Sequence, residues 1–199
     1  MYDRDMPIIR DHGLSSPEGL QDVLTFVLLT IRQPFPQIKS QMADVRKRGA
    51  KSKFLFGSKR DGFKYIRRER DWLLSRLLKC QAAGDTVEAI MTLTLVPGLG
   101  IIKAGFAAQC LGFESACLDM HNLARLGLPQ NSFHVSKSVK PETLQGHIRK
   151  YLAIAFEEGD ARYWWNSWCD YVAGLYDTLG GTGDHVSAYH CKAVGAFQS

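Results

Sequence analysis

Apolar residues recur at helical spacing in two segments of the first half of the chain. Between residues 20 and 31, leucine, valine and isoleucine occupy the i, i+3, i+4 and i+7 positions that line one face of a helix. Ser16 is placed to cap this helix, and Pro17 suits its first turn. A second stripe of the same kind spans residues 63–78 and ends before Gly84. Both segments are therefore predicted to be core helices.

Further helices are indicated by local start signals. Asp85 with Glu88 three residues later has the pattern of a capping box and predicts a helix to about residue 93. Other helices are expected over Pro141–Phe156 and from Asp160 to about residue 179. No segment alternates with a period of two, so a substantial sheet is not expected. The fold class is all-α, in one unit of 199 residues with a C-terminal helical region at about 140–199.

Positive charge is concentrated in one segment. The whole chain carries a net charge of +5, whereas residues 41–70 hold eleven Lys and Arg against three acidic residues. The glycines of this stretch predict a loop with short helical pieces. Such a basic segment attracts polyanions, because bound cations release counterions from phosphates. The DNA-binding candidates in this segment are Lys51, Lys53 and Arg67. The alternative is that the segment is a solvated charged loop.

The cysteine pattern and the hydropathy argue against disulfide-rich, zinc-ribbon and membrane proteins. The five cysteines are odd in number and form no C-x-x-C pair, which favours reduced thiols over a disulfide framework or zinc ribbon. His185, His190 and Cys191 are a weak metal-binding alternative, and we expect no metal. No run of about 18 apolar residues and no signal-peptide pattern is present. We therefore expect an intracellular protein without a membrane partner.

A tight turn separates two apolar helical segments at about residues 86–111. Residues 93–111 read LTLVPGLGIIKAGFAAQCL, which predicts a helix, a turn over Pro97–Gly100 and a second helix that begins at once. Glycines at 98 and 100 allow close backbone approach, and the first N–H groups of the second helix suit a phosphate. Pro97, Gly98, Leu99 and Gly100 are therefore DNA-binding candidates. An ordinary connection between two helices is the alternative.

The segment after the hairpin carries a family resemblance. Residues 111–129, LGFESACLDMHNLARLGLP, resemble the pattern of the helix-hairpin-helix DNA glycosylases, in which the hairpin helix ends at a glycine and a short loop delivers an aspartate. Here these are Gly112 and Asp119, with His121 close behind. The resemblance covers roughly residues 18–130 and implies a two-lobed helical fold that acts on a base taken out of the duplex. Asp119 then stabilises positive charge or deprotonates a nucleophile, and an N-cap role is the alternative.

The sequence departs from the glycosylase pattern in two ways, which narrow the range of glycosylases that it resembles. Ile102 occupies the position of the nucleophilic lysine of bifunctional glycosylases, with Lys103 one residue later, and the cysteines of an iron–sulfur cluster are missing. KAGFAAQCLGF and CLDMHNLARLG are similar to a bacteriophage branch, the amino acid:DNA transferases or α-glutamyl/putrescinyl thymine pyrophosphorylases. This implies transfer of an amino acid, such as glycine, onto pyrophosphorylated 5-hydroxymethyluracil in double-stranded DNA. The amino acid is a co-substrate, no cofactor is implied, and a monomer in the cytoplasm of the infected host is expected.

Under this resemblance the polar residues around the hairpin acquire roles. Asp119 and His121 are the catalytic candidates, Lys103 meets the pyrophosphate, and Gln109 and Asn122 contact substrate. For Gln109 a polar surface position is the alternative. A monofunctional glycosylase that excises one modified or damaged base remains open, as does a DNA-binding module without activity. The aromatic residues at 163–176 suit stacking on an extruded base, but their helical period favours core packing.

Overall fold

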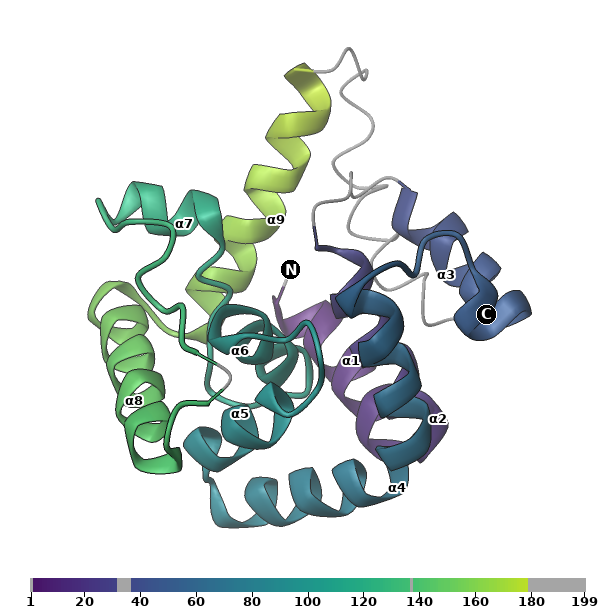
Figure 1. The fold of residues 1–199 in the computed structure, drawn as a ribbon. Coiled ribbons are helices and arrows are strands. Elements are labelled where there is room, and N and C mark those ends of the chain that lie inside the picture. Colours follow the sequence, from purple (N-terminus) through teal and green to yellow (C-terminus); the bar gives the residue numbers. More distant parts are fainter. Residues whose placement is uncertain (1, 32–36, 137, 179–199) are drawn as a thin grey trace.

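Helices account for most of the backbone that can be described. The computed structural model describes residues 2–31, 37–136 and 138–178, and within these ranges it contains no strand. The all-α prediction is therefore confirmed for this part of the chain. In order, the helices are α1 (Tyr2–Ser15), α2 (Pro17–Leu29), α3 (Ile38–Arg48), α4 (Ser58–Ala83), α5 (Thr86–Thr94), α6 (Ile101–Cys110), α7 (Met120–Arg125), α8 (Pro141–Glu158) and α9 (Ala161–Thr178), with a short 3₁₀ turn η2 (Gly49–Lys51) after α3 (Figure 1).

Helix α2 forms the centre of the core. Its predicted start is confirmed, because the Ser16 hydroxyl accepts a hydrogen bond of 3.0 Å from the Gly19 N–H and Pro17 is the first helical residue. Every side chain over residues 23–29 is buried, so the helix is enclosed on all sides rather than along one stripe. The neighbours that enclose it are α1, α3, α4 and α6. This full burial explains why six of its seven residues from 23 to 29 are apolar.

The prediction of a loop with short helical pieces over residues 41–70 is wrong for most of this range. Helix α3 covers residues 38–48, and α4 begins at residue 58 instead of 63. Ile38, Met42 and Val45 are buried and share one face of α3, although basic residues occupy much of the rest of that helix. Helix α1 also has no counterpart among the predicted elements. The end of α4 agrees with expectation, since Gly84 adopts a left-handed conformation with φ of 63°.

Helices α5 and α6 pack against each other on either side of the turn at residues 95–100. Asp85 caps α5 as predicted, because its carboxylate accepts a hydrogen bond of 2.9 Å from the Glu88 N–H. Helix α6 is almost entirely buried and lies in the middle of the molecule in Figure 1. Gly112 follows it with φ of 81°, where the sequence places the end of this helix. The turn is thus held by two packed helices.

The C-terminal helices complete the core on the side of α5 and α6. Pro141 opens α8, and the Asp160 carboxylate accepts a hydrogen bond of 2.8 Å from the Tyr163 N–H at the start of α9. Trp164 and Trp165 are fully buried, which confirms core packing for this part of the aromatic cluster. The side chains at 171–178 and all of residues 179–199 lie outside the described residues, including the weak metal-binding alternative at 185–191. None of the described helices is sufficiently long and apolar to cross a bilayer.

Candidate nucleic-acid interface

The turn between α5 and α6 lies against the start of α4. The Leu99 N–H donates to the Val96 carbonyl at 3.0 Å, and Gly98 has φ of 91°, where glycine is favoured. A Cβ atom on Gly98 would lie 3.4 Å from the Ser58 carbonyl oxygen. Gly62, one turn further along α4, leaves room for the Pro97 carbonyl. The conformation of the turn is therefore set by its packing on α4 as well as by its own sequence.

The four residues predicted to bind DNA in this turn have different surroundings. Gly98 and Gly100 are exposed and Pro97 is half-buried, whereas the Leu99 side chain is only 2% exposed and packs in the core. No side chain caps α6 at Gly100, and nothing lies within 4 Å of the position where a Cβ atom would be. Gly100, just before α6, is therefore open to a ligand on this side, whereas Ile101, the first residue of the helix, is only 1% exposed. The Leu99 side chain therefore anchors the turn in the core.

Asp119 lies at the start of α7, where the local chain geometry depends on its carboxylate. Its Oδ1 accepts a hydrogen bond of 3.1 Å from the Asn122 N–H, as an N-cap does. The Asn122 side chain is buried and donates a hydrogen bond of 2.6 Å to the Cys117 carbonyl. Asn122 thus fixes the loop that carries Asp119, and its amide nitrogen is engaged within the protein. His121 belongs to α7, but its side chain lies outside the described residues.

Lys103 and Asp119 both act electrostatically on one buried thiol, Cys117. The pKa of Cys117 is raised from 9.0 to about 12, mainly by burial and to a smaller extent by the Asp119 carboxylate, while the Lys103 ammonium opposes the shift. The two charged groups thus act with opposite sign on the same thiol, although they come from α6 and from the start of α7. Lys103 is half-buried, and its Nζ donates a hydrogen bond of 3.4 Å to the Thr30 hydroxyl at the end of α2.

Gln109 has an internal position. It is fully buried, so the alternative of a polar surface residue is wrong. Its Nε2 donates a hydrogen bond of 2.8 Å to the Ala161 carbonyl, which links α6 to the start of α9. Its Oε1 has no hydrogen-bond partner among the described residues. A contact with substrate stays a prediction for this residue.

The basic segment forms one wall of an open hollow of about 450 Å³ among α2, α3 and α4. Arg46, Arg67 and Arg70 line it. Arg46 pairs with Asp22 at 2.9 Å and Arg70 with Glu18 at 2.8 Å. Arg67 is exposed and makes no ion pair with a described residue, which leaves its guanidinium available for a phosphate. Sequence reasoning missed this hollow because it depends on α3 being a helix.

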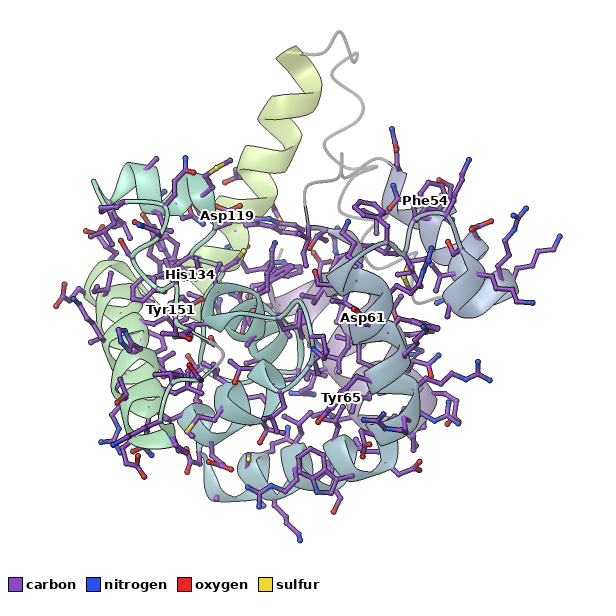
Figure 2. All side chains as sticks on the ribbon, viewed as in Figure 1. Phe54, Asp61, Tyr65, Asp119, His134 and Tyr151 are labelled. Atoms are coloured by element: carbon purple, nitrogen blue, oxygen red, sulfur yellow. The ribbon has the colours of Figure 1, made fainter. Side chains whose placement is uncertain are left out.

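Exposed cations extend the basic surface beyond the hollow. Lys51 and Arg67 line a second, shallower depression that adjoins the first, together with Lys47 and Arg48. Lys53 is exposed, and its Nζ lies 5.2 Å from the centre of the Phe54 ring. In Figure 2, Phe54 lies beside α3, whereas Asp119 lies on the opposite side of the molecule, next to α7. The candidate reactive group and the most basic surface are therefore separate regions.

Comparisons with known proteins assign no family. The chain matches no protein-family model, no curated protein and no solved structure. Among the described residues, no group of three or more His, Cys, Asp or Glu is arranged to hold a metal ion.

Proposed function

We propose that the chain modifies a base in DNA, transferring an amino acid onto pyrophosphorylated 5-hydroxymethyluracil with release of pyrophosphate. The observation that carries the proposal is that the Lys103 ammonium and the Asp119 carboxylate both act electrostatically on the buried Cys117 thiol. The reaction needs both kinds of group: a carboxylate for the incoming amine and cations for a highly anionic leaving group. The motif resemblance suggests the substrate, and the shared electrostatic effect on Cys117 supports the pairing of the two charges.

The chemical step forms one bond and breaks one bond. The neutral amine of the amino acid attacks the exocyclic methylene carbon of the base, and the bond from that carbon to the pyrophosphate oxygen breaks. The amine nitrogen then carries a proton that must leave, and the Asp119 carboxylate is the proposed acceptor or orienting group. The bonding electrons depart with the pyrophosphate, whose charge Lys103 stabilises. His121 and Asn122 follow Asp119 two and three residues later in the sequence.

We interpret the hairpin of α5 and α6 as the element of a two-lobed, glycosylase-like fold that binds the DNA backbone. The left-handed Gly98 and the exposed, uncapped Gly100 support this interpretation, since the backbone at the start of a helix suits a phosphate. The basic surface with Lys51, Lys53 and Arg67 is proposed to contact further backbone phosphates. These contacts hold the duplex without reading its sequence, while the target base leaves the stack.

The proposal is tested by nucleoside mass spectrometry of duplex DNA that carries 5-hydroxymethyluracil or its phosphorylated and pyrophosphorylated forms. Each DNA is incubated with the protein and a mixture of amino acids. We expect a nucleoside heavier by one amino acid, only from the pyrophosphorylated base. Free base and abasic DNA without any amino acid requirement would identify a glycosylase instead. If the protein binds these DNAs but none of them reacts, both the transferase and the glycosylase hypotheses are contradicted. A DNA-binding module without activity is then favoured.

Variants of Asp119 separate catalysis from capping. Asn is as good an N-cap as Asp, so Asp119→Asn retains α7 but removes the charge. We expect this variant to lose about 10²–10⁴-fold in rate. Asp85 is a matched control, because its carboxylate caps α5 in the same way. Asp85→Ala should cost about 1 kcal/mol of stability and leave the rate unchanged.

A further inference from the structure

Lys59, a second lysine near Lys103, is buried although its side chain is charged. Lys59 lies in the first turn of α4, and its side chain is only 4% exposed. Its Nζ has no hydrogen-bond partner among the described residues and lies 5.1 Å from the centre of the Phe56 ring. A buried ammonium without a counter-charge is unfavourable, and an isolated one is rare in proteins. Such a group therefore points to a ligand of opposite charge.

The packing of three helix ends brings Lys59 toward Lys103. The start of α4 lies against the α5–α6 turn, where Ser58 is next to Gly98. The Leu28 side chain, near the end of α2, lies close to both Gly62 and Gly98. Two residues later Thr30 accepts the hydrogen bond from Lys103. The end of α2 and the beginnings of α4 and α6 therefore meet at one place.

The electrostatics agree with this geometry. Burial lowers the pKa of Lys59 below its usual value, and repulsion from the Lys103 ammonium lowers it further. Two ammonium groups that repel each other are held at the same helix junction, so folding leaves an excess of positive charge there. Excess charge of this kind is typical of functional sites. A multiply charged anion between the two lysines would relieve both the burial and the repulsion.

We propose that Lys59 and Lys103 form a binding site for a phosphoryl group where α4 and α6 begin. As a site for the leaving pyrophosphate, the inference rests on the proposed function. The N–H groups at the start of α6 add donors and a favourable dipole to the two ammonium groups. Lysine has a flexible four-carbon stem, so the buried ammonium of Lys59 reaches an anion by rotation of its side chain. Lys59 then compensates the charge of the departing group together with Lys103.

Calorimetric titration with inorganic pyrophosphate tests the site directly. We expect wild-type protein to bind pyrophosphate, and both Lys59→Met and Lys103→Met to weaken binding at least about tenfold. Methionine has a similar length without charge, which suits the buried position. Lys79→Met is the matched control on the exposed part of the same helix and should bind as wild type does. Thermal unfolding of each variant shows that the fold is retained, and Lys103→Met gives an independent reading if Lys59→Met unfolds.

Titration with unmodified duplex DNA distinguishes the source of the phosphoryl group. Loss of pyrophosphate affinity in both variants, with unchanged DNA affinity, assigns the site to the leaving group. Loss of DNA affinity with no pyrophosphate binding assigns it to a backbone phosphate. Wild-type affinity of Lys59→Met for both ligands overturns the inference. Lysine-dependent pyrophosphate binding without amino acid transfer would overturn the proposed function alone, whereas transfer at the wild-type rate by Lys59→Met would overturn only the site.

Discussion

The hairpin and the segment that follows it are held in contrasting ways. Helix α6 is enclosed by apolar side chains, and its turn packs on α4. Residues 113–123, which carry Asp119, also bury apolar side chains, but they are held in addition by directional hydrogen bonds from two side chains. The Tyr151 hydroxyl donates to the Ala116 carbonyl and accepts a hydrogen bond of 3.5 Å from the Leu118 N–H, and Asn122 binds the Cys117 carbonyl. The hairpin should therefore be sensitive to added volume and the segment to lost polar atoms.

Gly105 joins the two regions, and its replacement is expected to have the largest effect. A Cβ atom there would lie 2.7 Å from the ring of Tyr151, which is fully buried and unable to move aside. Gly105→Ala should therefore lower the free energy of unfolding by about 3 kcal/mol. Gly146→Ala is the control in α8, because nothing lies within 4 Å of its Cβ position. That variant should gain up to about 1 kcal/mol. Urea unfolding measures both, and equal stabilities would contradict the packing of α6 on α8.

Removal of the Tyr151 hydroxyl tests the polar attachment of the segment. Tyr151→Phe leaves the buried carbonyl of Ala116 without its donor, and this should cost about 1–3 kcal/mol. Amide hydrogen exchange should show that the loss falls on residues 113–123 more than on α6. Tyr65→Phe on α4 is the control, since its hydroxyl makes no hydrogen bond with a described residue; Figure 2 labels both tyrosines. A uniform change across the protein would show that the two regions unfold together.

The elements that could be predicted from sequence are those whose signals act locally. Ser16, Asp85 and Asp160 each cap a helix through a group three residues away, so each start is visible in the sequence. Helix α3 was missed because its basic residues obscure a stripe of only three buried apolar residues, over Ile38–Val45. A charge count describes what a segment attracts, whereas its fold depends on the few positions that become buried.

Candidate residues were predicted less completely than the helices. The motif resemblance predicts Lys103 and Asp119, whose charges both act on the buried Cys117 thiol. Lys59 was one of many cations in a basic segment, and only tertiary packing buries it. The internal hydrogen bond of Gln109 to Ala161 likewise depends on a helix 52 residues further along the chain. Burial and distant partners have no local signal, so these assignments require the structure.

The two exposed glycines of the turn provide a smaller test of the hairpin. Gly98→Ala places a side chain at φ of 91° and should cost about 1–2 kcal/mol. Gly100→Ala has φ of −74° and open space around it, so its stability should change by less than about 0.5 kcal/mol. Thermal unfolding compares the two variants. If the turn meets a phosphate, Gly100→Ala should still weaken duplex binding, whereas unchanged binding would remove the turn from the DNA interface.

Alkaline titration tests whether the segment stays packed around Cys117. The pKa of this thiol is about 12 in the folded protein, raised by burial first and then by the Asp119 carboxylate, against 9.0 in the unfolded chain. Because the folded pKa is the higher one, the contribution to stability is complete below pH 9 and is lost as the pH rises toward 12. From pH 8 to 10, wild type should lose roughly 1 kcal/mol more than Cys117→Ala. Denaturant unfolding at each pH measures this difference. Parallel curves would mean that the thiol reaches water and that the segment opens without global unfolding.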